Sequence, residues 1–400
     1  MRLYGILAAL LALWALVLLA LNLTLGLDTY SYSYYSIDYT FGFVRRGLAG
    51  ELVKLLPGDN AFIHQRIGRW ISSGVFFFAL GVLAWWIAAS SGRSERRKQL
   101  ALLLTVLPFG YSFGLLSAGS TLYGGAALIM FGVAVARAGS ANSVLIASTI
   151  FGLVTALLAL IHEAIPFLIG LGVITVIATL ANQMGRIKFW FCCALALGPG
   201  LAMAAVIAVF GVHGVADQLC TLMPHAQINN PLAGNPSFMD LLAGYRHYDD
   251  YHDWACRNIT PLYNKGIVDG MRFVGLLGPA GMIINTVYGL GLVILTAVSI
   301  GFVSGVPPQR IWVLLRQRPI ALAIGLGLMV PIFLTGIDWV RWWVSISLDI
   351  GLGYLLYASR QPEIDALPTR CSMRVFIVLL ITLALIPIGI VPAFFAPLAL

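Results

Sequence analysis

Uninterrupted apolar runs of roughly 18 or more residues recur along the whole chain, and they limit its fold more than any other feature. A run of that length crosses the hydrocarbon core of a membrane as a helix. The runs are continuous and do not alternate with polar residues, which excludes a membrane β-barrel. With 60% hydrophobic and only 10% charged residues, the chain is too apolar for a water-soluble domain. The sequence therefore predicts an all-α, polytopic transmembrane helical bundle in which residues 1–400 form a single transmembrane domain.

The apolar runs divide into about eleven predicted spans, with boundaries good to a few residues. Their approximate ranges are 3–25, 69–90, 100–119, 121–137, 143–162, 165–183, 188–212, 278–303, 319–337, 342–359 and 375–397. No small-residue cleavage site follows the first run, so we interpret it as a retained helix and not as a signal peptide.

The charged residues between the spans separate into two sets. One set of short connections is basic, as in "SGRSERRKQ" (residues 91–99), and the positive-inside rule places it in the cytoplasm with the N-terminus. The other set holds the six histidines, most of the acidic residues and two longer loops, 26–68 and 213–269. We therefore expect a multi-pass plasma-membrane protein (bacterial inner membrane) whose working face is external, either periplasmic or extracellular. The net charge of +8 is spread over the loops, so nucleic acid is not expected as a partner.

Two adjacent arginines, Arg45 and Arg46, stand in the first external loop, in "DYTFGFVRRGLAGELVKLLPG" (residues 38–58). Leucines at helical spacing follow them, which predicts a short amphipathic helix in the outer membrane interface. Guanidinium groups beside the N–H groups of a helix start, with glycines nearby, are typical of a phosphate or pyrophosphate site. The alternative is nonspecific contact with the anionic head groups of membrane lipids.

A tyrosine-rich stretch, "LDTYSYSYYSIDY" (residues 27–39), precedes the arginines. Aromatic faces beside carboxylates suit a sugar ring, which makes Tyr35 a candidate substrate contact. Either Asp28 or Asp38 is a candidate acceptor for the proton of an attacking hydroxyl group. For the tyrosines as a group, the alternative is an aromatic belt at the membrane surface.

A His–Glu pair, His162 and Glu163, ends the fifth predicted span in "LIHEAIPF". Ionisable side chains at membrane depth are costly unless they are paired or functional. The histidine is a candidate base or hydrogen-bond donor. The alternative is a capped helix end at which Glu163 forms an ion pair with an arginine.

A polar stripe is predicted in the tenth span, in "GIDWVRWWVSISLDIG" (residues 336–351). Asp338, Arg341, Ser345 and Asp349 share one face of a helix, and the stripe descends about 16 Å from the outer surface. A carboxylate within an apolar run, here Asp349, is a functional hypothesis by default, and Arg341 is the candidate ligand contact. The alternative is an Asp338–Arg341 salt bridge that holds two helices together.

The second external loop contains Cys220 and Cys256, which are candidates for a disulfide in an oxidising compartment. Between them lies "YRHYDDYHDW" (residues 245–254), rich in histidine and aspartate. A divalent metal at this external segment is one interpretation, but the spacing matches no standard zinc pattern. A solvated loop facing the substrate is the other, and the sequence requires no metal or cofactor.

The motifs "FGFVRRGLAGEL", "IHEAIPF" and "DWVRWW", in this order, are similar to motifs of polytopic bacterial proteins that assemble cell-envelope polysaccharides. The chain thereby resembles O-antigen-type polysaccharide polymerases and GT-C-like glycosyltransferases. The resemblance covers the multi-span layout and these motifs, and it lacks the C-terminal soluble domain that GT-C enzymes often add. It implies an external active site, a polyprenyl-(pyro)phosphate-linked sugar donor and no nucleotide sugar. It also implies that Asp28 or Asp38 is the acidic residue of the first external loop.

These features together predict a glycosyltransferase or polysaccharide polymerase that transfers a sugar from the lipid-linked donor to a glycan or lipid acceptor. Arg45, Arg46 and Arg341 would neutralise the leaving phosphate. Asp38, Asp28 or His162 would accept the proton, and Glu163 would orient the histidine or the sugar. An alternative from another class is a transporter or flippase of an anionic lipid or solute, with the stripe ending at Asp349 as part of its path. A noncatalytic assembly scaffold is the third interpretation.

Overall fold

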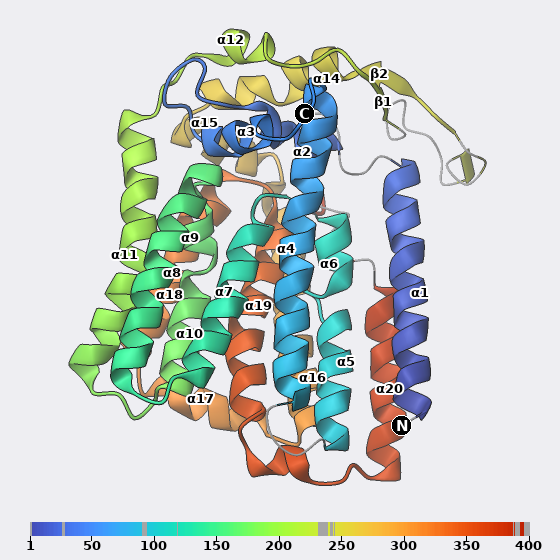
Figure 1. Cartoon of the computed structure of the whole chain (residues 1–400), viewed down its shortest axis with the longest axis vertical. Coiled ribbons are helices and arrows are strands. Elements are labelled where there is room, and N and C mark those ends of the chain that lie inside the picture. The colour runs from blue at the N-terminus through green and yellow to red at the C-terminus, as the bar shows by residue number, and fades with distance from the viewer. Residues whose placement is uncertain are drawn as a thin grey trace.

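The computed structural model describes residues 2–25, 29–89, 94–117, 119–230, 239–240, 243, 245–386, 388 and 393–395. Within these ranges nearly all regular structure is helical, apart from one small sheet of two strands. Long helices run side by side as a bundle, and shorter elements lie across the end that is uppermost in Figure 1. The prediction of a helical membrane protein is confirmed.

Every predicted span range overlaps one or two helices of the bundle. The bundle helices are α1 (Arg2–Leu25), α4 (Ala61–Ala89), α5 (Glu95–Val106), α6 (Tyr111–Leu116), α7 (Leu122–Arg137), α8 (Ala141–Ile161), α9 (Ile165–Leu168), α10 (Gly170–Leu180), α11 (Arg186–Phe210), α16 (Gly278–Ser304), α17 (Pro308–Arg316), α18 (Pro319–Thr335), α19 (Trp339–Ala358) and α20 (Arg370–Leu385). Of these bundle helices, α17 alone lies between two predicted ranges, 278–303 and 319–337.

Six helical segments among the described residues are long and apolar enough to cross a membrane. They are Leu3–Leu23, Ala61–Ala89, Glu95–Leu116, Ala141–Ile161, Arg186–Phe210 and Gly278–Ser304. A seventh is added if α17 and α18, which meet at a bend of 99°, are counted as one span. The number of eleven spans stays a prediction, because several of the bundle helices are shorter than a membrane crossing requires.

A proline explains why the range 100–119 holds two helices. Helix α5 ends at Val106, two residues before Pro108, and the chain turns before α6 begins at Tyr111. Proline disfavours helical backbone at the preceding residue and has no N–H group to donate. The range therefore folds as two short helices with a break inside the bundle.

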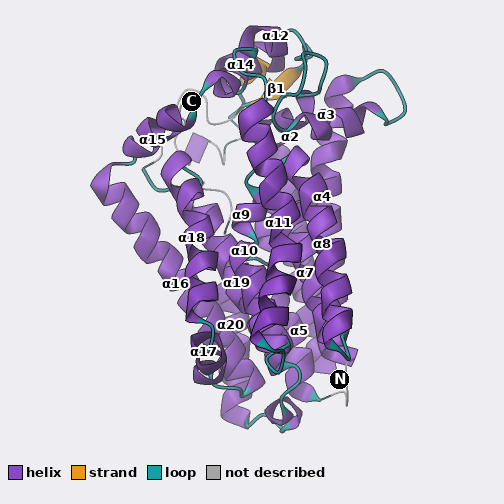
Figure 2. Ribbon diagram, turned by 90° about the vertical axis from the view of Figure 1, so that its left-hand side faces the viewer, coloured by secondary structure: helices purple, strands orange, loops and turns teal. Residues whose placement is uncertain are grey.

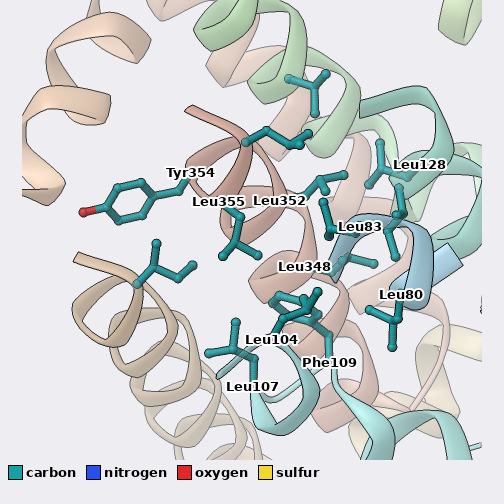
Figure 3. Close-up of a cluster of buried hydrophobic side chains, with 14 of the residues drawn as sticks. Leu80, Leu83, Leu104, Leu107, Phe109, Leu128, Leu348, Leu352, Tyr354 and Leu355 are labelled. Carbon is teal, nitrogen blue, oxygen red and sulfur yellow. The ribbon is translucent and has the colours of Figure 1, made fainter. Parts of the chain in front are cut away.

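Helix α19 lies inside the bundle, in contact with α7, α10 and α16. Its Leu352 and Leu355 are fully buried, and Figure 3 shows them among side chains of α4, α5 and α7. The close approach of α10 depends on Gly353, where a β-carbon would lie 2.6 Å from the Cγ2 atom of Thr175. This packing fixes the polar residues that α19 carries toward its upper end.

The periphery of the bundle is apolar. Leu10, Leu13 and Leu16 of α1 are 57 to 61% exposed. Helix α1 lies beside α20 in Figure 1, and the Nε1 group of Trp14 donates a hydrogen bond of 2.7 Å to the carbonyl of Ala384. Exposed leucine on the outside of a helical bundle is the surface that lipid acyl chains solvate.

Short elements from both predicted loops form the upper layer of the molecule (Figures 1 and 2). These elements are α2 (Thr29–Ser33), η1 (Tyr34–Ser36), α3 (Gly47–Lys54), α12 (Ala216–Cys220), β1 (Gln227–Asn229), β2 (Tyr248–Asp250), α14 (Tyr251–Asn258), η2 (Thr260–Asn264) and α15 (Ile267–Gly275). Strands β1 and β2 pair antiparallel, with Gln227 opposite Asp250. A disulfide between Cys220 and Cys256 joins α12 to α14. Buried apolar residues from both loops pack together in this layer.

The opposite end of the bundle carries the basic connections and a 3₁₀ turn, η3 (Pro362–Asp365). The Nε atom of Arg97 lies 3.0 Å from a carboxylate oxygen of Asp365. Arg310 pairs with Glu363 at 2.6 Å. At this end the arginines hold connections together.

Candidate functional site

The two adjacent arginines lie where the first loop turns into α3. Arg46 immediately precedes the helix in the left-handed backbone conformation, with φ of 65°. The glycines of the motif serve packing: a β-carbon at Gly50 would lie 2.1 Å from the carbonyl oxygen of Ile37. That same oxygen accepts a hydrogen bond of 3.1 Å from the backbone N–H of Gly50. Gly50 therefore allows two segments of the chain to pack closely, and its N–H group is already hydrogen-bonded and is not available to a phosphate.

Arg46 forms a two-pronged ion pair with Glu163. Its Nε and Nη2 atoms donate to the two carboxylate oxygens at 2.9 and 2.8 Å. The guanidinium carbon lies 4.7 Å from the centre of the Tyr34 ring. Burial alone would raise the pKa of Glu163, but the charge of Arg46 and its hydrogen bonds outweigh burial and lower it. Glu163 is therefore ionised, and most of its bonding capacity is directed at Arg46.

Arg45 is held less completely. One Nη atom donates to the carbonyl of Leu262 in η2, and the guanidinium lies 5.2 Å from the Tyr263 ring centre. Its nearest distance to Glu163 is 4.0 Å. The Nε atom of Arg45 is buried and has no acceptor within the described part of the chain. A buried guanidinium donor without an acceptor is the type of group that a bound anion or water satisfies.

His162 caps the end of α8 beside this pair. Its Nδ1 atom accepts a hydrogen bond of 3.2 Å from the backbone N–H of Ala164, which assigns the ring proton to Nε2. Burial and the nearby charge of Arg46 lower the pKa of His162 to about 3. The imidazole is therefore neutral at physiological pH and a weak proton acceptor.

The start of α19 brings Asp338 and Arg341 to the same region. Their side chains approach at 3.4 Å, which is a long contact, and each is only partly exposed. The Nε atom of Arg341 is buried and unpaired with respect to the residues that the structure describes. Trp342 of this helix and Ala164 of the neighbouring turn pack against one apolar cluster, which joins α19 to the His–Glu segment.

Tyr30 connects the two halves of the site. Its hydroxyl accepts a hydrogen bond of 2.7 Å from Tyr34. Burial raises the pKa of Tyr30; the charges of Tyr34 and Asp338 raise it further, and Arg46 partly opposes them. The groups that shift this pKa belong to both the first loop and the start of α19.

We refer to Arg45, Arg46, Glu163, Asp338 and Arg341 as the arginine cluster. Three arginines and two carboxylates leave one excess positive charge, since His162 is neutral. Tyr30, Tyr34 and Tyr263 supply aromatic rings around it. A net positive, aromatic-lined group of side chains at the upper ends of the helices suits an anionic group attached to a lipid or sugar.

Asp349 lies deeper in the bundle and apart from the cluster. It is 1% exposed, and neither carboxylate oxygen accepts a hydrogen bond of normal geometry from the described residues. The backbone of Gly172 in α10 packs closely against it. A cavity of about 20 Å³, lined also by Thr121 and Ser345, lies beside it. That volume accommodates one water molecule.

Two predicted site residues lie in the scaffold of the first loop. Asp38 forms an ion pair of 2.6 Å with Lys54 and accepts a hydrogen bond of 2.8 Å from the backbone of Thr40. Tyr35 is 3% exposed and packs with Ala49 and other apolar residues beneath α3. Neither residue contacts the arginine cluster through any interaction among the described residues, and Asp28 lies outside those residues.

Sequence reasoning missed Tyr30, Tyr34 and Tyr263 as individual members of the site. The first two stand four residues apart in the tyrosine-rich stretch, so helical spacing was the available signal. Tyr263 lies in η2 and carries no motif of its own. Its place against Arg45 depends on the fold of the second loop.

The disulfide region contains one cluster of metal-ligand type among the described residues, formed by Cys220, His252 and Cys256. The Nε2 atom of His252 lies 3.8 Å from each sulfur. While the two sulfurs are bonded to each other, they offer no thiolate to a metal. The cluster shares no residue with the arginine cluster.

Comparisons with known proteins identify relatives over nearly the whole chain. The family model described as "Uncharacterised membrane protein Rv1490" matches residues 4–384. Relatives from Mycobacterium tuberculosis (strain H37Rv), "Uncharacterized protein Rv1490", and from Mycobacterium bovis, "Uncharacterized protein Mb1527", are 39% identical over 360 residues. The alignments cover 89% of this chain and 83% of each relative. No solved structure matches the chain.

Proposed function

The chain belongs to the Rv1490 family of membrane proteins, and we propose that it is a membrane-embedded glycosyltransferase or polysaccharide polymerase. Its donor is a sugar linked to polyprenyl phosphate or pyrophosphate, and its acceptor is a glycan or a lipid. The arginine cluster binds the donor phosphate. The observation that carries the proposal is a pair of buried guanidinium Nε atoms, in Arg45 and Arg341, that have no acceptor among the described residues and lie beside a net positive charge.

The three arginines have different roles in this proposal. Arg46 is committed to Glu163 by two short hydrogen bonds. Arg45 and Arg341 retain donors and bind the phosphate oxygens. As the bond between the sugar and the phosphate breaks, negative charge grows on the phosphate, and fixed cations stabilise the transition state more than the ground state.

The proton of the acceptor hydroxyl passes to Asp338. The hydroxyl oxygen attacks the anomeric carbon, the bond from that carbon to the phosphate oxygen breaks, and the phosphate leaves with the electron pair. Among the described carboxylates, Glu163 is held by Arg46 and Asp38 by Lys54 at 2.6 Å, whereas Asp338 has only a long contact with Arg341. Asp338 is therefore the carboxylate best able to accept a proton.

The membrane arrangement forms part of the same proposal. The eleven predicted spans cross the inner membrane with the N-terminus in the cytoplasm, and the upper layer faces the external side. The lipid tail of the donor lies along the apolar outer surface of the bundle while its phosphate reaches the arginines. Substrate delivered from within the membrane explains why the cluster adjoins helix ends and not the top of the second loop.

A transporter or flippase of an anionic lipid or solute is the second candidate. It is favoured by Asp349, a carboxylate deep in the bundle that has no hydrogen-bond partner among the described residues and lies beside a small, mostly apolar cavity. Sugar transfer at the upper end gives this carboxylate no role. The two candidates therefore differ in whether Asp349 or Arg341 is essential.

The test uses ligands that do not depend on the identity of the sugar. Binding of polyprenyl phosphate and of polyprenyl pyrophosphate is measured for the detergent-purified protein and for Arg45→Ala, Arg341→Ala and Arg341→Lys. Arg257→Ala, an exposed arginine of the same upper layer, is the matched control. We expect each alanine variant to weaken binding by at least about tenfold, Arg341→Lys to weaken it less, and the control to bind normally.

Transfer is then measured in liposomes that contain polyprenyl-linked labelled hexose as donor. We expect transfer by the wild type and a loss of about 100-fold in the Arg45 and Arg341 alanine variants. Labelled lipid that crosses the bilayer without sugar transfer, with dependence on Asp349, would replace the enzyme by the transporter. Normal lipid-phosphate binding by both alanine variants would refute the phosphate role of the cluster.

A further inference from the structure

Helix α15 exposes an apolar stripe although it lies in the polar upper layer. Ile267, Val268 and Met271 are 72, 61 and 50% exposed. The opposite face is buried: Val274 is 5% exposed, and a β-carbon at Gly270 would lie 2.6 Å from the backbone oxygen of Thr335 in α18. One face thus packs on the bundle, and the other presents branched and sulfur-containing side chains outward.

This stripe continues onto the outside of α16. The chain passes from α15 into α16 with only two residues between them, and α16 is one of the helices able to cross a membrane. Ile283, Val287 and Ile294 of α16 are 62 to 65% exposed. Figure 2 shows α15 directly at the upper end of α16, on the outside of the molecule. The lipid that surrounds α16 would therefore also contact the apolar stripe of α15.

A pocket of about 540 Å³ lies between η2 and α15, on the side of the helix next to the stripe. Lys265, Arg272 and Asp269 give it one excess positive charge, and Phe273 and Leu276 give it apolar walls. The Nζ atom of Lys265 lies 5.2 Å from the Phe273 ring centre. Arg272 and Asp269 approach only to 3.8 Å and are largely exposed, so the guanidinium donors remain accessible.

We propose that α15 lies in the outer membrane interface and that the pocket beside it binds the head group of an anionic phospholipid. The phosphate lies between Lys265 and Arg272, and the acyl chains pass along Leu276 toward the exposed face of α16. An amphipathic helix with basic residues flanking its apolar stripe is the arrangement that binds an anionic membrane surface.

A lipid fits this pocket better than a soluble anion does, because the apolar wall includes Leu276, which lies in the connection from α15 to α16, and the outer face of α16 is apolar. The site is separate from the arginine cluster and does not rest on the proposed sugar transfer. The two sites share one element: the carbonyl of Leu262 in η2 accepts a hydrogen bond from Arg45, while Pro261 and Asn264 of the same turn line the pocket.

The test measures lipid retention by native mass spectrometry. Full-length protein is released from vesicles of equal phosphatidylglycerol and phosphatidylcholine, and the bound lipids are counted. The test variant is Lys265→Gln with Arg272→Gln. The matched control is Arg246→Gln with Arg257→Gln, which removes the same charge from the upper layer outside the pocket.

We expect the wild type and the control to retain phosphatidylglycerol preferentially, and the pocket variant to retain it about tenfold less. A second variant, Met271→Glu, leaves the basic residues in place and should also reduce retention because it puts a charge on the apolar stripe. Equal retention by the pocket variant and the control would overturn the proposal. Displacement of the phospholipid by free glycerol phosphate at matched concentration would overturn the assignment to a lipid.

Discussion

Replacement of Glu163 by glutamine tests how the arginine cluster is held together. The substitution keeps the size of the side chain but removes its charge, and it leaves Arg46 without its carboxylate partner. The two side chains are 25 and 16% exposed, so the pair is mostly buried. Loss of one partner of a fully buried ion pair costs about 3–5 kcal/mol, and partial exposure reduces this to about 2–3 kcal/mol. We therefore expect Glu163→Gln to lower the free energy of unfolding by that amount.

The assay is reversible unfolding in mixed detergent micelles, followed by circular dichroism, for Glu163→Gln, Arg46→Gln and the double variant. Because the two groups contact each other directly, the double variant should be less destabilised than the sum of the single variants, with a coupling of about 1–3 kcal/mol. A coupling energy close to zero would refute the ion pair as the element that holds the first loop to the α8–α9 turn.

The pH dependence of this difference has a definite sign. Folding lowers the pKa of Glu163 below its ordinary value, so its contribution is present above the ordinary carboxyl pKa and is lost as pH falls through the lowered one. The gap between the wild type and Glu163→Gln should therefore stay constant above about pH 5 and shrink in acid. A gap that grows in acid would contradict the assignment of an ionised Glu163.

Three further predictions address single residues. Folding lowers the pKa of His162 to about 3, so the unfolded chain binds a proton there at higher pH than the folded protein does. Below about pH 6.5, the free energy of unfolding of the wild type should therefore fall by up to about 1.4 kcal/mol per pH unit relative to that of His162→Asn. Unfolding at several pH values measures this difference, and parallel profiles would refute the buried neutral ring. Gly50→Ala should destabilise by about 1–3 kcal/mol because its β-carbon meets the Ile37 carbonyl, whereas Gly74→Ala, with open space around it, should not; equal effects would refute the packing role. Asp349→Asn should leave the free energy of unfolding within about 1 kcal/mol of the wild type, because the amide has the same size and the side chain has no hydrogen-bond partner to lose among the described residues. A large loss would show such a partner.

The sequence was sufficient to locate most of the bundle helices, because each of them except α17 overlaps a continuous apolar run. Helix α17 lies in a connection between two predicted spans. Interruptions were harder to predict. Pro108 divides one range into two helices, although proline also occurs inside α11 at Pro199 and inside α18 at Pro331 without ending either helix. Whether a proline breaks a helix depends on what its neighbours do for the freed backbone groups, and that is a property of the packed bundle.

The sequence predicted which residues belong to the site better than it predicted which of them pair with each other. Charge asymmetry assigned the arginines, His162, Glu163 and Asp338 to one face, and the structure brings these residues to the upper end. The sequence analysis gave, as an alternative, an ion pair between Glu163 and an arginine that it did not identify. The structure shows that this arginine is Arg46. Asp38 was expected near a substrate, and the structure pairs it with Lys54, the last residue of α3. Helix α3 folds back on the preceding segment and brings the two side chains together.

The two adjacent arginines illustrate why a motif alone does not assign roles. Just before α3, the two adjacent side chains point in different directions. The backbone at Arg46 is left-handed, and its side chain contacts Glu163, whereas the side chain of Arg45 contacts η2. One arginine therefore joins two loops, and its neighbour keeps a buried donor unpaired among the described residues. The same adjacency explains why the pair tolerates both charges: Glu163 lies within 4.0 Å of each, so a single carboxylate offsets part of their mutual repulsion. An anion that binds to Arg45 and Arg341 would supply the remaining compensation, so occupancy of the site and stability of the first loop should be linked through Glu163.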